Sequence, residues 1–166
     1  MERSGPKWPV IILGRFGAGT VQIFRGSYQA SIDDKGRLKL PVRLKQQVEE
    51  WFGSLVFVTS LAPHELRIYP MAAWEDVERR FLSHPAMNPL VSRLMEHANY
   101  GQDAEMDAQG RVLIPALLRE VIQVNGEVVV SGRGRFLAVV SRERAQGELA
   151  TAFTMEELAA LAALEQ

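Results

Sequence analysis

The sequence predicts an α+β fold in which one unit of about 45 residues occurs twice. Three observations support this prediction. The segment from Ser31 to Pro41 matches the segment from Glu105 to Pro115 at an offset of 74 residues. Alternating apolar and polar residues precede the first copy, as in a half-buried strand, and an amphipathic helical pattern follows each copy.

The first copy predicts a strand, a tight turn, a second strand and a helix. Residues 24–32 alternate between apolar and polar side chains, which is typical of a strand with one buried face. Residues 33–36 contain Asp and Gly, which favour a turn, and residues 38–40 form the returning strand. A helix is expected to begin at Pro41, because proline is suited to the first turn of a helix.

The second copy predicts the same order, with a turn at residues 107–110 and a helix that begins at Pro115. Each helix ends near a glycine and leads into two further strands. These four strands are predicted at residues 55–59, 65–69, 128–130 and 136–140. Additional helices are predicted at residues 72–80, 88–98 and 154–164.

A unit of this size buries too little surface to be stable alone, so the two units are expected to share one core. The predicted organisation places an N-terminal extension before the first unit and a helical connector between the units. The ranges are 1–23 for the extension, 24–72 for the first unit, 73–97 for the connector, 98–144 for the second unit and 145–166 for a C-terminal helical tail.

Composition excludes several classes of function. The 166 residues include no cysteine, which excludes disulfides, thiolate metal sites and a cysteine nucleophile. The three histidines lack metal-ligand spacing, so no metal site is predicted. No cofactor and no catalytic residue are predicted either. The longest apolar run is too short to span a membrane, and a cytoplasmic protein is expected.

Two glycine-rich segments have simple interpretations. Residues 14–19 lack the Lys-Ser/Thr of a phosphate-binding loop, so such a loop is excluded. Residues 132–135 are interpreted as a hairpin turn.

Charge distinguishes the two copies, although the whole chain has a net charge of only −1. Residues 24–45 carry six basic and two acidic side chains, a net charge of +4, whereas residues 98–120 carry two basic and four acidic ones, a net charge of −2. Electrostatic attraction supplies much of the affinity for DNA, so the first unit is expected to face nucleic acid. The predicted DNA-binding residues are Arg25, Lys35, Arg37, Lys39 and Arg43.

Arg37 and Arg111 each have a second interpretation. Both follow an aspartate by four residues, so a carboxylate–guanidinium pair could simply close each turn. We assign this structural role to Arg111 and a DNA contact to Arg37, and the two roles are compatible. We expect Arg25 to lie near the first turn. The predicted structural turn residues are Asp33, Gly36, Asp107, Gly110 and Arg111.

The chain resembles the MraZ family, in which two SpoVT/AbrB-type units are fused. The residues that carry the resemblance are Phe24-Arg25-Gly26, the two Asp-x-x-x-Arg turns and the passage from Tyr69-Pro70 to Trp74-Glu75. The resemblance covers about residues 24–140 and implies a swapped-hairpin, AbrB-like barrel and a ring of many subunits. Family members typically begin with Met directly before Phe-Arg-Gly, whereas 23 residues precede Phe24 here.

The resemblance implies a sequence-specific DNA-binding transcriptional regulator. It would bind short direct repeats in double-stranded promoter DNA of the division and cell-wall gene cluster, including its own promoter. It would act in the cytoplasm at the nucleoid, with no membrane association and no enzymatic activity. One alternative is an antitoxin-like protein-binding module of the same fold. Another is a hydrolase, for which the sequence offers no grouping of Asp and His.

Overall fold

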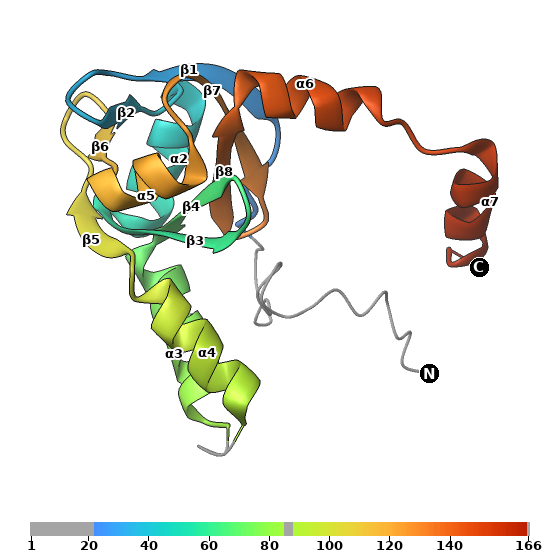
Figure 1. Cartoon of the computed structure of the whole chain (residues 1–166), viewed down its shortest axis with the longest axis horizontal. Helices are drawn as coiled ribbons and strands as arrows, with labels where there is room; N and C mark the ends of the chain where they lie inside the picture. Colours follow the sequence, from blue (N-terminus) through green and yellow to red (C-terminus); the bar gives the residue numbers. More distant parts are fainter. Residues whose placement is uncertain (1–21, 85–87, 166) are drawn as a thin grey trace.

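The computed structural model describes residues 22–84 and 88–165 (Figure 1). Its strands are β1 (Ser27–Ile32), β2 (Arg37–Lys39), β3 (Leu55–Ala62), β4 (Glu65–Pro70), β5 (Gln102–Glu105), β6 (Arg111–Leu113), β7 (Gly126–Arg133) and β8 (Phe136–Ser141). Its helices are α2 (Val42–Phe52), α3 (Met71–Leu82), α4 (Pro89–Ala98), α5 (Ala116–Ile122), α6 (Arg142–Ala150) and α7 (Met155–Ala163). The predicted N-terminal extension lies almost entirely outside the described residues.

The strands form one antiparallel sheet of eight strands that nearly closes into a barrel. The order is β5-β3-β4-β8-β7-β1-β2-β6, and it mixes strands of the two units. β1 of the first unit pairs with β7 of the second at six positions, and β5 of the second unit pairs with β3 of the first at four. Each unit therefore inserts its hairpin into the sheet of the other, which confirms the α+β, swapped-hairpin, AbrB-like fold.

Equivalent positions of the two repeats meet in the barrel interior. Leu38 lies directly opposite Val112, and both side chains are fully buried. Helices α2 and α5 bury equivalent residues against the same core, which are Leu44 and Val48 in α2 and Leu118 and Ile122 in α5. The two units thus share one hydrophobic core, because neither hairpin has a partner strand within its own unit beyond the short pairing at its turn.

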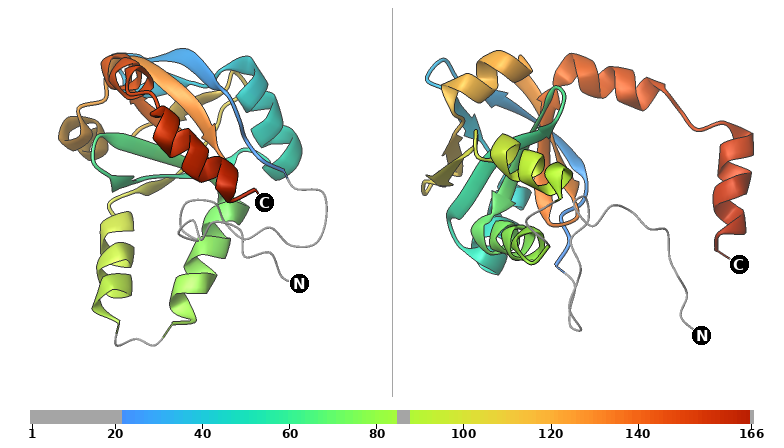
Figure 2. Two further views of the ribbon diagram at one scale, coloured as in Figure 1. Left: turned by 90° about the vertical axis from the view of Figure 1, so that its right-hand side faces the viewer. Right: turned by 60° about the horizontal axis from the view of Figure 1, so that its bottom comes forward.

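An aromatic cluster anchors the connector to the barrel. Trp74 of α3 stacks on Phe57 with ring centroids 4.5 Å apart, and Tyr69 contacts both Trp74 and Phe136. Beyond this anchor, α3 and α4 extend away from the sheet (Figures 1 and 2). Both helices were predicted from the sequence, and α3 extends two residues further than expected at its C-terminal end.

The C-terminal tail contains two separate helices. Ser141 caps α6 by accepting a hydrogen bond from the N–H of Arg144, and Thr154 and Glu157 form a capping box at α7. All residues of α7 are exposed, and Figure 2 shows the helix standing clear of the barrel. The sequence predicted a helix at residues 154–164, and the structure places one there that is exposed on all sides within one chain. Its length of nine residues is below the ~12–15 at which isolated helices become stable.

The β7–β8 hairpin turns at Gly134 and Arg135, within the segment 132–135 where the sequence predicts a turn, and Gly134 has a φ of 77°. No helix within the described ranges combines the length and the apolar character that crossing a lipid bilayer requires.

We predict that Phe24→Ala lowers the free energy of unfolding by about 3–5 kcal/mol, because the ring is 1% exposed and its removal leaves a cavity. The ring packs against Trp51 and Phe52 with centroids 5.3 and 5.9 Å away. Phe153→Ala is the control, since that side chain is 66% exposed, and its effect should stay within about 0.5 kcal/mol. Urea denaturation of both variants measures the difference, and equal effects would contradict the assigned core.

Candidate nucleic-acid interface

Turn 1, defined as residues 33–37, is organised around the carboxylate of Asp33. Its Oδ1 accepts hydrogen bonds from the backbone N–H groups of Lys35 at 3.0 Å and Arg37 at 2.9 Å. Its Oδ2 accepts from Nε of Arg37 at 3.0 Å. The single aspartate therefore fixes both the backbone of the turn and the direction of the Arg37 guanidinium, whose side chain remains 35% exposed.

Turn 2, defined as residues 107–111, repeats this arrangement in the second unit. Oδ1 of Asp107 accepts from the N–H groups of Gln109 and Arg111, both at 2.9 Å, and Oδ2 accepts from Nε of Arg111 at 2.8 Å. Arg111 thus makes the carboxylate–guanidinium contact that a turn-closing role requires. Arg37 makes the same contact, so it closes its own turn in addition to any contact with DNA.

Both aspartates are held in their ionised form. The backbone N–H of Arg37 that donates to Asp33 lowers the pKa of that carboxyl below its ordinary value of 3.8. The N–H of Arg111 lowers the pKa of Asp107 in the same way, with a further contribution from the Arg111 guanidinium. Both ion pairs are therefore fully formed at neutral pH.

Each turn is also tied to the other unit by its glycine. The carbonyl of Gly36 accepts a hydrogen bond from the N–H of Ile114 at 2.8 Å, and the carbonyl of Gly110 accepts from the N–H of Leu40 at 2.9 Å. The two glycines have φ values of 83° and 80°, which residues other than glycine rarely adopt. Both glycines lie at the positions where the sequence predicts turns.

Strands β2 and β6 form a short antiparallel ribbon between the two turns. Arg37 lies opposite Leu113, and Lys39 lies opposite Arg111. Because side chains alternate across a strand and the central residues of both strands are buried, these outer residues share the opposite face. Arg111 thus lies on the same face as Lys39, so cations of both units occupy a surface that the charge count assigned to the first unit alone. In Figure 1 both turns lie on the left of the barrel, away from α3, α4, α6 and α7.

Four of the five predicted DNA-binding residues surround this ribbon. Lys35 is exposed at the tip of turn 1, beside Arg37. Lys39 is exposed on β2, and Arg43 is exposed in the first turn of α2. Two residues beyond Arg43, the side chain of Lys45 packs against Gly110 of turn 2. The predicted set is therefore distributed between both turns rather than gathered at turn 1.

Arg25 does not lie near turn 1, and the expectation that it would is wrong. β1 pairs with β2 only at Ile32 and otherwise runs along β7, so Arg25 lies beside Gly132 near the β7–β8 turn. At about 3.3 Å per residue, the six residues of β1 alone separate Arg25 from turn 1 by roughly 20 Å. The expectation overlooked the length of this extended strand, which separates its two ends whichever strand lies beside it.

Sequence reasoning did not identify Arg119 as part of this surface. A Cβ at Gly36 would lie 2.6 Å from Cζ of Arg119, so the guanidinium of this second-unit residue rests on turn 1. The repeat could have identified Arg119, because this residue is equivalent to Lys45 of the basic first unit at the repeat offset of 74 residues. Counting charge along the chain instead assigned Arg119 to the acidic segment.

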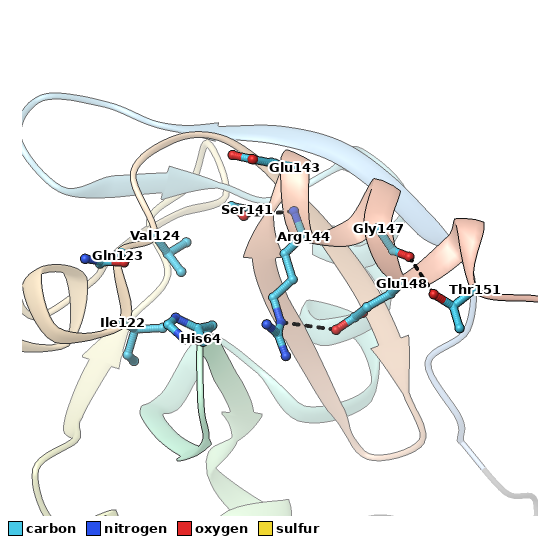
Figure 3. Close-up of a pocket in the computed structure, with 10 residues that line it drawn as sticks. All are labelled: His64, Ile122, Gln123, Val124, Ser141, Glu143, Arg144, Gly147, Glu148 and Thr151. Atoms are coloured by element: carbon cyan, nitrogen blue, oxygen red, sulfur yellow. Dashed lines mark hydrogen bonds and ion pairs between the residues drawn. The ribbon is translucent and has the colours of Figure 1, made fainter.

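Outside the two turns, we considered metal-ligand groups and the pocket beside α6 in the described part of the chain. No group of three potential metal-ligating side chains occurs there. Figure 3 shows a pocket of about 570 Å³ between α6 and the end of α5. Glu148 in this pocket lies 3.2 Å from Nε of Arg144, and Glu143 points away from His64. The pocket therefore presents no paired acid and base, and the turns with their ribbon remain the candidate site.

Comparison with known proteins points to one family. The family described as "MraZ protein, putative antitoxin-like" matches residues 23–97 and 100–146. A protein of Acidobacterium capsulatum is 46% identical over 73% of this chain and 84% of its own length. Proteins of Koribacter versatilis and Nitrosomonas europaea are 44% and 34% identical over 81% of this chain, covering 94% and 92% of their own lengths. All three are named transcriptional regulator MraZ.

We predict that Asp107→Asn lowers the thermal unfolding midpoint at pH 7 and that the difference from the wild type disappears in acid. The folded-state pKa of Asp107 is depressed, so its stabilising effect is present above the ordinary value of 3.8 and is lost as pH falls through the folded value. Differential scanning fluorimetry between about pH 2 and pH 7 measures this.

Asp34→Asn is the matched control for the pH experiment. Asp34 is an exposed neighbour in turn 1 whose carboxylate accepts no hydrogen bond in the described part of the chain. Its replacement should leave the midpoint at pH 7 nearly unchanged. A constant difference between Asp107→Asn and the wild type across the whole pH range would show that the ion pair is not its source.

Proposed function

This chain belongs to the MraZ family, and on that basis we propose that it is a transcriptional regulator that binds double-stranded promoter DNA through the outer face of the β2–β6 ribbon. The observation that carries the proposal is the fixed guanidinium of Arg37. Its Nε is bound by Asp33, which leaves the two terminal nitrogens free of partners within the described residues. Arginine reads guanine through two such donors, so the ion pair holds the group ready for a base edge.

The shape of the ribbon fits this role. A two-stranded antiparallel ribbon is narrow enough to enter the major groove of B-DNA, which is about 12 Å wide. The outer face of β2 and β6 carries Arg37, Lys39 and Arg111, and Lys35 lies at one end of it. We assign base contact to Arg37 and phosphate contacts to Lys35, Lys39 and Arg43. Arg25 lies too far along β1 to join this group and would reach only a flanking phosphate.

The family resemblance extends the proposal to the target. We expect the chain to bind short direct repeats in the promoter of the division and cell-wall gene cluster, including its own promoter, and to act at the nucleoid in the cytoplasm. It needs no cofactor for this and carries out no reaction, because binding alone controls access to the promoter.

Assembly into a homo-oligomeric ring is part of the proposal. A chain of net charge −1 with a small basic face binds DNA weakly by itself. Several copies that engage repeated sites together gain ~10²–10⁴ in affinity without new contacts. Exposed apolar side chains support such contacts between subunits, and they include Tyr100, Phe153 and Met155.

An antitoxin-like protein-binding module is the second candidate. The exposed apolar residues of α7 favour it, since a short unpartnered helix of this kind suits a groove on another protein. The two candidates differ in a simple way. A regulator binds its promoter as the purified chain alone, whereas a protein-binding module would require its partner.

We predict that Arg37→Ala abolishes the specific shift of a promoter fragment while the native mass stays unchanged. A bidentate guanine contact is worth roughly 1–3 kcal/mol, which corresponds to about 5- to 150-fold in affinity. Arg111→Ala is the matched control, because it removes an ion pair of the same geometry from turn 2. Both variants should lower the thermal midpoint, but only Arg37→Ala should lose specificity in an electrophoretic mobility-shift assay.

Equal loss of specific binding in two folded variants would contradict this division of roles between Arg37 and Arg111. Retention of the specific shift by Arg37→Ala would remove the base contact from the proposal. In either case circular dichroism at the assay temperature establishes that the variants are folded.

We also predict that the native mass corresponds to many subunits and that it increases by a discrete amount when a promoter fragment with repeats is added. Binding should weaken steeply as salt increases, because each neutralised phosphate releases counterions. Native mass spectrometry and anisotropy titrations measure the two effects. A monomer that binds a single repeat as tightly as several repeats would refute the role of assembly.

A further inference from the structure

We propose that Arg119, on helix α5 of the second unit, contacts a DNA phosphate beside turn 1 of the first unit. The inference rests on the proposed DNA-binding function and adds one residue to its interface. Arg119 belongs by sequence to the acidic copy of the repeat, but the exchange of hairpins brings it to the basic turn. The contact would make the DNA-binding surface at turn 1 a composite of both units.

The position of Arg119 is fixed by two contacts. Its Nε donates a hydrogen bond to the carbonyl of Ile114 at 3.2 Å. Its guanidinium packs on Gly36, where a Cβ would lie 2.6–2.8 Å from Cζ, Nη2 and Nε of Arg119. Gly36 is held in turn by the N–H of Ile114, which donates to its carbonyl at 2.8 Å. A side chain at position 36 would displace the guanidinium, and the φ of 83° independently favours glycine there.

The terminal nitrogens of Arg119 have no protein partner within the described residues. They lie against Gly36, and the neighbours of Gly36 in the chain are Lys35 and Arg37. The guanidinium of Arg119 therefore packs on the turn whose own residues include two further cations. Arginine suits phosphate because its planar donors match two oxygens at once, and an Nε already bound to protein limits the entropy lost on contact.

The equivalent residue at turn 2 has a different environment. Lys45 packs against Gly110, where a Cβ would lie 2.7 Å from its Cδ, just as Arg119 packs against Gly36. However, Nζ of Lys45 lies 3.5 Å from Oε1 of Glu49, so the Lys45 ammonium already has a carboxylate partner. The residue that corresponds to Glu49 beside Arg119 is Gln123, which is neutral. The two repeats thus share a brace on the glycine, but only Arg119 keeps its charge available for a ligand.

The test compares Arg119→Ala, Arg119→Lys and the matched control Lys45→Ala in the full-length chain. Affinity for a promoter fragment is measured by fluorescence anisotropy between about 50 and 200 mM KCl. Arg119→Ala should reduce the slope of log K against log salt by about 0.9 per contact. Arg119→Lys should restore this slope because it keeps the charge. Lys45→Ala should leave the slope at the wild-type value, although it removes an equivalent brace.

Three results would overturn the inference while leaving the proposed function intact. The first is an unchanged slope in Arg119→Ala alongside a loss of specificity in Arg37→Ala. The second is an equal change in Arg119→Ala and Lys45→Ala, which would indicate a shared structural brace. The third is a loss in Arg119→Lys as large as in Arg119→Ala. Failure of the wild-type chain to bind DNA would instead refute the proposed function itself.

Discussion

Backbone pairing between the two repeat units holds this molecule together. β1 runs along β7 for its whole length and β5 runs along β3, so each unit completes its sheet with strands from the other. A single unit would leave these strand edges unpaired and half of the core exposed, which is costly in water. The duplicated chain solves this within one polypeptide. The β2–β6 ribbon, where the two hairpins meet, exists only because of the exchange.

The same exchange explains how two similar turns come to have different surroundings. Asp33 and Asp107 close their turns with nearly identical hydrogen bonds, so the repeat has retained the geometry that fixes an arginine. The side chains around that geometry differ, since Lys35 is replaced by Gln109 at the equivalent position. The conserved carboxylate serves the fold of both turns, while the surrounding charges give turn 1 the more cationic environment. A structural ion pair and a binding arginine are therefore compatible in one residue.

Much of this arrangement could be predicted from local sequence. The repeat, the glycine turns, the aspartate–arginine spacing and most helices and strands follow from residue types at short separations. Strand partners are not encoded locally, because the alternation in β1 predicts a buried face but not which strand lies beside it. Arg119 was missed for that reason, whereas Arg25 was misplaced because the length of the extended strand β1 was overlooked. Helix α6 was not separated from the tail because it is polar on all sides and shows no apolar period.

The distribution of surfaces around the barrel bears on how binding and assembly can coexist. The two turns lie on one side, whereas α3 and α4 leave the barrel on another and α6 and α7 on a third (Figure 1). Exposed apolar side chains on α7, such as Met155 and Leu158, therefore lie on a different side of the barrel from the two turns. Contacts between subunits through these projecting helices would leave the ribbon uncovered. Under the proposed function, an assembly of this kind would present many basic ribbons at once, and that multiplicity would compensate for the small cationic face of each chain.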